Sequence, residues 1–184
     1  MSGSMTGSPQ YLGIEPIRRG TPAACIQDII TVHFPDAKTV WDCRWGTGRL
    51  WQWSHHLTVY GMDRDPASTA RIRADAHAIP CQSLAVDLAC FDLIPIGPPD
   101  PDGPLFRVVE ELARIARMGL ILMGQDLVYD VGPDWWSILM ITGIHNRLGI
   151  WPRDLVMQHS NRRFWTRPSR VRRARTYYAI YRWL

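Results

Sequence analysis

Long apolar runs, paired cysteines and lysine are what this sequence of 184 residues has least of. No apolar run reaches the roughly 18 residues that a transmembrane helix needs, so a membrane span is not expected. The N-terminus lacks the basic and apolar pattern of a secretory signal, and we therefore expect a cytoplasmic protein. The four cysteines show no C-x-x-C spacing and no matching histidine cluster, which disfavours a metal site and favours buried, reduced thiols.

The composition that remains is typical of one globular domain. A hydrophobic content of 46% is enough for a sizeable core. Residues 1 to 10 are rich in serine and glycine, and we expect them to be flexible. Residues 11 to 184 are then expected to form a single domain without internal repeats.

Basic charge is concentrated near the C-terminus. Residues 147 to 184 hold ten arginines against one acidic residue, a net charge of +9, whereas residues 1 to 146 carry −5; the chain has a single lysine. The arginines are interleaved with Phe164 and Trp165, a mixture that suits phosphate contact and base stacking. A solvated basic hairpin without a specific partner is the alternative interpretation. The arginines that we expect to contact nucleic acid are Arg162, Arg163, Arg167, Arg170, Arg172 and Arg173.

Segments typical of strands alternate with segments typical of helices. We expect strands at residues 39 to 42, 57 to 62, 72 to 74, 91 to 96 and 119 to 123. We expect helices to begin near residues 22, 49, 65, 104 and 134, the first of them capped by Thr21. Such alternation predicts an α/β fold with a doubly wound, mostly parallel sheet that binds its ligand at the carboxyl ends of the strands. Two further β-like runs, at residues 153 to 158 and 176 to 183, end the chain.

The most informative segment joins the first two expected strands. The first strand ends in Asp42, and Gly46 and Gly48 follow in a turn, where glycine permits a positive φ and a close approach of backbone to ligand. The second strand ends in Asp63, a carboxylate suited to a ribose diol. We therefore expect a nucleoside site here. Alternatively, Asp42 only caps the turn and Asp63 only precedes a capping Asp65.

In order and spacing this segment resembles the first motif, roughly Asp-x-Gly-x-Gly-x-Gly, of the class I S-adenosylmethionine-dependent methyltransferases. Arg44 takes the place of the first glycine, and Trp45 that of a small residue. The resemblance implies a seven-stranded sheet that ends in an antiparallel hairpin, with S-adenosylmethionine as cofactor. The residues that it assigns to the cofactor are Asp42, Arg44, Gly46, Gly48 and Asp63, with Asp75 and Ala76 at the adenine ring. A short acidic turn without a ligand is the alternative for Asp75.

After the fourth expected strand, the sequence resembles the catalytic motif of amino-methylating DNA methyltransferases, including small phage and bacterial ones. That motif reads Asp/Asn-Pro-Pro-aromatic. Here Gly97 takes the place of the polar residue and Asp100 that of the aromatic one. The resemblance implies methyl transfer to an exocyclic amine of a nucleic-acid base, with DNA favoured over RNA. The residues that it assigns to catalysis are Gly97, Pro98, Pro99 and Asp100.

Two other functions are consistent with the sequence. The altered residues at positions 44, 97 and 100 are what a catalytically inactive methyltransferase-like protein would show, one that binds nucleic acid or a partner protein. A small-molecule methyltransferase is the other, but it leaves the arginine cluster unexplained. The compact size leaves no separate target-recognition domain, so strong sequence specificity would require a partner subunit, and otherwise only a short motif would be read. A homodimer is a further possible assembly.

Overall fold

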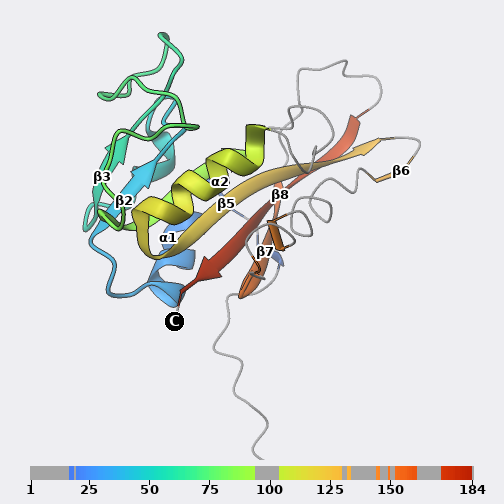
Figure 1. Ribbon diagram of the computed structural model, residues 1–184. Helices are drawn as coiled ribbons and strands as arrows, with labels where there is room; N and C mark the ends of the chain where they lie inside the picture. Colours follow the sequence, from blue (N-terminus) through green and yellow to red (C-terminus); the bar gives the residue numbers. More distant parts are fainter. Residues whose placement is uncertain are drawn as a thin grey trace, which may run out of the picture.

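A mixed β-sheet organises the part of the chain that the computed structural model describes (Figure 1). The described residues are 17–18, 20–93, 104–129, 132–133, 144–145, 149, 152–160 and 171–183. The strands lie in the order β1-β7-β8-β5-β4-β2-β3, and β6 pairs with β5. Their bounds are β1 Ile17–Arg18, β2 Thr39–Asp42, β3 Thr58–Gly61, β4 Val86–Leu93, β5 Ala116–Tyr129, β6 Gly132–Pro133, β7 Asp154–Ser160 and β8 Val171–Arg182.

The directions of the strands confirm the expected architecture. Strands β3, β2, β4 and β5 run parallel to one another. Strand β8 is antiparallel to both β5 and β7, which is the expected C-terminal hairpin. Among the described residues, six strands have four or more residues, and the predicted count of seven is not confirmed.

Between β3 and β4 the chain departs from the predicted helix and strand. In place of the expected third strand, the described residues form an isolated parallel bridge between Met62 and Ile72. Residues 65 to 85 contain no helix. The guanidinium of Arg73 instead donates to the backbone carbonyls of Asp65 and Ser68. The carbonyl of Asp65 also accepts the backbone N–H of Ser68 in a turn, so the guanidinium and this turn take the place of helical hydrogen bonds.

Strand β4 begins at Val86 rather than at residue 91. Leu88 and Cys90 are buried on one face of the sheet, as the period-two geometry of a strand requires. The charged Asp87 interrupts the apolar pattern and hid the strand from the sequence interpretation. Its carboxylate accepts hydrogen bonds from two backbone N–H groups at the start of β2 (2.8 and 2.9 Å).

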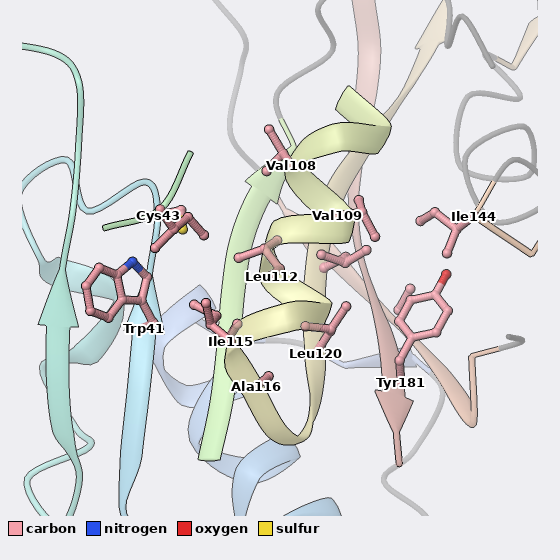
Figure 2. Close-up of a cluster of buried hydrophobic side chains, with 14 of the residues drawn as sticks. Trp41, Cys43, Val108, Val109, Leu112, Ile115, Ala116, Leu120, Ile144 and Tyr181 are labelled. Carbon is pink, nitrogen blue, oxygen red and sulfur yellow. The ribbon is translucent and has the colours of Figure 1, made fainter. Parts of the chain in front are cut away.

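One described helix covers each face of the sheet. Helix α1 (Pro22–His33) begins as predicted, because Thr21 Oγ1 accepts a hydrogen bond from the backbone N–H of Ala24 (3.2 Å). The helix expected from residue 49 is only the 3-10 turn η1 (Arg49–Trp51). The core on the α1 face includes Ile26, Ile29, Val40, Trp51, Leu88, Ile121 and Tyr178. The core beneath helix α2 (Pro104–Ile115) includes Trp41, Leu112, Ile115, Leu120 and Tyr181 (Figure 2).

Helix α2 also holds the segment that precedes β4. The guanidinium of Arg114 donates to the backbone carbonyls of Cys81 (2.8 Å) and Ile79 (3.1 Å). The carboxylate of Glu111 accepts from the backbone N–H of Ile79 (2.9 Å) and from Arg114 Nε (2.8 Å). The hydrogen bond from Arg114 lowers the pKa of Glu111, so this carboxyl stays ionised at neutral pH.

Three sequence predictions concern parts of the chain that the structure does not describe or describes only in part. The expected flexible stretch at residues 1 to 10 lies outside the described residues, as does the beginning of the helix expected from residue 134, of which the described residues Ile144 and His145 are helical. Within those that are described, no helix combines the length and the apolar character needed to cross a membrane.

Candidate functional site

Strand β2 delivers Asp42 into the glycine turn as a buried carboxyl. Its Oδ1 accepts a hydrogen bond from the backbone N–H of Arg44 (2.9 Å), and its Oδ2 accepts one from the indole N–H of Trp51 (2.6 Å). Burial raises the pKa of Asp42 to about 6, although both of these hydrogen bonds act to lower it. Since each oxygen already has a donor, this carboxyl fixes the turn against η1.

The glycine turn is also tied to the end of β3. Gly46 and Gly48 have positive φ angles of 55° and 71°, which explains why glycine occupies both positions. Asp63 Oδ2 accepts from the backbone N–H of Gly46 (2.9 Å), and Oδ1 accepts from that of Asp65 (2.9 Å). Burial opposes ionisation of Asp63, but these donors and the Ser68 side chain outweigh it and lower its pKa. An ionised carboxylate offers about four lone-pair sites, so Asp63 can still accept a further donor.

The indole of Trp45 lies against two glycines. A Cβ on Gly61 would lie 2.3 Å from the indole ring, and one on Gly48 would lie 2.4 Å from it, so neither position has room for a larger residue. The indole N–H donates to Thr69 Oγ1 (3.1 Å). A Cβ on Gly46, in contrast, would meet no atom within 4 Å. The turn is therefore covered at Gly48 and open at Gly46.

Arg44 extends from the turn towards the end of β4. Its Nη1 donates to the backbone carbonyl of Asp92 (3.2 Å). Burial raises the pKa of the Asp92 carboxyl, and the positive charge of Arg44 opposes that rise. The same charge acts on the carboxylate of Asp63. Arg44 thus brings a half-buried positive charge to the carboxyl ends of β2, β3 and β4.

Asp92 is a residue of this site that the sequence interpretation missed. It follows Leu88 and Cys90 at intervals of two, so it belongs to the α1 face of β4. Cys90 is the register partner of Asp42 on β2, and the two aspartates are close enough for the charge of Asp92 to raise the pKa of Asp42. The signal was present in the alternation of β4, but we had placed that strand too late in the sequence.

Asp75 lies on the surface in a turn of its own. Its carboxylate accepts a hydrogen bond from the backbone N–H of His77 (2.9 Å) and contacts the imidazole of the same residue. These interactions lower the pKa of Asp75. Ala76 belongs to the same turn. The adenine contacts of Asp75 and Ala76, and the alternative of a short acidic turn, both stay predictions.

The remaining predicted site residues fall where the structure gives no side-chain description. Gly97, Pro98, Pro99 and Asp100 lie outside the described residues, as do Arg162, Arg163, Arg167 and Arg170. Arg172 and Arg173 belong to β8. Within the described ranges, no group of three or more histidine, cysteine or acidic side chains is arranged to hold a metal ion. None of the four cysteines, all of which are described, forms a disulfide, and Cys25, Cys43 and Cys90 are buried.

No protein-family model and no curated protein matches the sequence. Solved structures do match its fold. A SAM-dependent methyltransferase from Aquifex aeolicus is 16% identical, with a TM-score of 0.50 over 86% of this chain and 88% of its own. The 1,6-didemethyltoxoflavin-N1-methyltransferase of Burkholderia thailandensis, solved with its methyl acceptor and S-adenosylhomocysteine, is 13% identical, with a TM-score of 0.57 over 88% of this chain and 77% of its own.

A third structure extends the comparison. It is a SAM-dependent methyltransferase from Thermotoga maritima, described as a possible histamine N-methyltransferase, and it is 12% identical, with a TM-score of 0.51 over 86% of this chain and 87% of its own. This chain has a Rossmann-like methyltransferase fold. These structural matches show the fold. Because their sequence identities are only 11% to 16%, they leave the substrate open, since proteins of one fold can act on different molecules.

Proposed function

We propose that this protein is an S-adenosylmethionine-dependent methyltransferase that acts on an exocyclic amine of a nucleic-acid base, with DNA favoured over RNA. The observation that supports a cofactor site is the glycine turn between two parallel strands, flanked by Asp42 and Asp63. A ligand of an α/β sheet binds at this edge, at the carboxyl ends of its strands. One solved protein of the same fold holds S-adenosylhomocysteine.

The described residues fit such a nucleoside. Asp63 is ionised and keeps acceptor capacity for a ribose diol, and the backbone at Gly46 is open. When bound, S-adenosylmethionine supplies an electrophilic methyl group on a sulfonium. The part of the protein is then to hold the acceptor amine in line with that methyl group, because such a transfer depends mainly on positioning. A base within a duplex would first have to be flipped out of the stack.

The topology of the C-terminal hairpin supports a nucleic-acid substrate. Strand β7 ends at Ser160 and strand β8 begins at Val171, which is the register partner of Tyr129 at the end of β5. Since β5 runs parallel to β4 and β2, both ends of the connection lie in the direction of the carboxyl ends of those strands, beyond the level of Leu93, whose register partner on β5 is Gly124. The connecting residues 161 to 170 include four arginines, a phenylalanine and a tryptophan. Such a segment suits phosphate contact and base stacking.

Calorimetric titration with S-adenosylmethionine and S-adenosylhomocysteine tests the cofactor. We expect dissociation constants of about micromolar for the unaltered protein. Asp42→Ala and Asp63→Asn should each weaken binding at least about tenfold, the first through the turn and the second through the ribose. The control Asp36→Asn removes the charge of an exposed aspartate and should bind normally. Circular dichroism establishes that each variant is folded.

Transfer of a tritiated methyl group tests the substrate. The protein is incubated with labelled S-adenosylmethionine and, separately, with single-stranded DNA, duplex DNA and single-stranded RNA. We expect label in DNA, and less of it after Arg172→Ala with Arg173→Ala. Protein that binds S-adenosylmethionine but labels none of the three would refute the nucleic-acid assignment and leave the methyltransferase assignment in place.

A second candidate function, a catalytically inactive nucleic-acid-binding protein, is favoured by how the chain fills its own turn. Trp45 covers Gly48 and Gly61, and the carboxylates of Asp63 and Asp75 already accept donors from the protein. For such a protein we expect folded samples that show neither heat nor a thermal shift with S-adenosylmethionine. DNA binding would persist in Asp42→Ala and would weaken on replacement of the β8 arginines by alanine.

A further inference from the structure

The guanidinium of Arg44 has hydrogen-bonding capacity to spare. A guanidinium carries five N–H donors in a planar fork. Within the described ranges, its one side-chain hydrogen bond is that from Nη1 to the backbone carbonyl of Asp92 (3.2 Å). The backbone N–H of Arg44 is bonded to Asp42, so the base of the side chain is fixed by the turn. A half-buried guanidinium held in this way is prepared to bind a carboxylate, often through two parallel bonds.

Asp92 shows the complementary property. Its carboxyl is half-buried, and among the described residues no donor forms a hydrogen bond with it. The other acidic side chains near the turn differ in this respect. Asp42 accepts two hydrogen bonds and Asp63 accepts donors on both of its oxygens. Asp92 is thus the carboxyl at this sheet edge that retains its full capacity for an ammonium or amine donor.

The charges around these two residues restrict the ligand. The charge of Arg44 acts on the carboxyls of Asp63 and Asp92, and both of these lie close enough to the carboxyl of Asp42 to raise its pKa. A phosphate dianion would be repelled by this set, whereas a ligand that carries both a cation and a carboxylate would find a partner for each. An α-amino acid group is such a ligand.

We propose that Arg44 and Asp92 form a binding site for the amino-acid end of the methyl donor, with Arg44 bound to the α-carboxylate and Asp92 to the α-ammonium. The inference rests on the proposed function. It gives the arginine that replaces the first glycine of the turn a positive role in selecting the donor. The site would distinguish a nucleoside that carries an amino acid from one that lacks it.

The test compares two ligands by calorimetry. S-adenosylhomocysteine carries the amino-acid end, and 5′-methylthioadenosine has the same nucleoside and sulfur without it. Arg44→Gln and Asp92→Asn should each weaken S-adenosylhomocysteine about ten- to hundredfold, as expected for the loss of a charge-assisted hydrogen bond. Both variants should bind 5′-methylthioadenosine within about twofold of the unaltered protein. Arg71→Gln, which removes an exposed arginine charge, is the matched control.

Each other outcome overturns part of the proposal. Arg44→Gly restores the family glycine, and equal or tighter binding of S-adenosylhomocysteine by it would show that Arg44 obstructs the site. Equal losses for the two ligands would assign Arg44 and Asp92 to the fold of the turn alone. Folded, unaltered protein that binds neither ligand would refute the proposed function and this inference with it. Binding of S-adenosylhomocysteine that the variants leave unchanged would refute the inference alone.

Discussion

Replacement of Asp42 by asparagine should change how the stability of the fold depends on pH. The carboxyl is 2% exposed, and burial raises its pKa from 3.8 to about 6. Between these two values the native state holds a proton that the unfolded state has released. The free energy of unfolding therefore falls as the pH rises through this interval, and it levels off above about pH 6. A shift of roughly two pKa units corresponds to about 3 kcal/mol.

The asparagine variant isolates this contribution. The asparagine amide cannot ionise. Its NH2 group would face either the backbone N–H or the indole N–H that Asp42 accepts, so two donors would oppose each other at a cost of about 1–3 kcal/mol that does not depend on pH. Asp63, Asp87 and Glu111 have lowered pKa values, so their contribution to stability is lost as the pH falls below about 5. They are common to both proteins, and this contribution largely cancels in the difference.

Urea unfolding measured at several values between about pH 4 and about pH 7.5 gives the difference directly. The advantage of the unaltered protein should shrink by about 3 kcal/mol from the acidic to the neutral end. Asp36→Asn, at an exposed aspartate, should show no such trend. A difference between the Asp42 variant and the unaltered protein that is constant over this range would contradict the argument from burial.

Three further substitutions test the packing. Gly119→Ala places a Cβ 2.0 Å from a backbone carbonyl oxygen of β8, so urea unfolding should show a loss of about 1–3 kcal/mol or more. Arg114→Met removes the guanidinium donor from the carbonyl of Cys81 and one of two donors from that of Ile79, so a loss of about 1–3 kcal/mol should appear in the same measurement, with native-state hydrogen exchange accelerated in that segment. Gly61→Ala should displace the indole of Trp45 and shift tryptophan emission, and an unchanged spectrum would contradict the close contact between them.

The parts of the fold that the sequence predicted are those governed by local rules. Strand β2 has the predicted bounds, and α1 begins at the predicted Thr21 cap, because alternation and capping are written into neighbouring residues. The expected third strand and the helix before it failed because Arg73 binds backbone carbonyls that a helix would have used. Strand β4 was placed too late because Asp87, a charged residue, is satisfied by the start of β2.

In the candidate site, too, features set by neighbouring residues were predictable and features set by contacts between distant residues were not. The positive φ of Gly46 and Gly48 was predictable, because the two glycines follow a strand that ends in an aspartate. Asp92 was not found, since its place depends on the register of β4 against β2. The direction of the Arg44 side chain depends on its hydrogen bond to the backbone carbonyl of Asp92 on β4. A sequence pattern holds no information about a contact between residues so far apart in the chain.

The donors that shape the glycine turn are main-chain groups. The N–H groups of residues 44 and 46 bind the carboxylates of Asp42 and Asp63, and every amino acid except proline carries such a group. A change of side chain at position 44 therefore leaves these two main-chain bonds available. A turn held by main-chain donors is compatible with many sequences, and this chain shares its fold with 154 solved chains although no family model matches it.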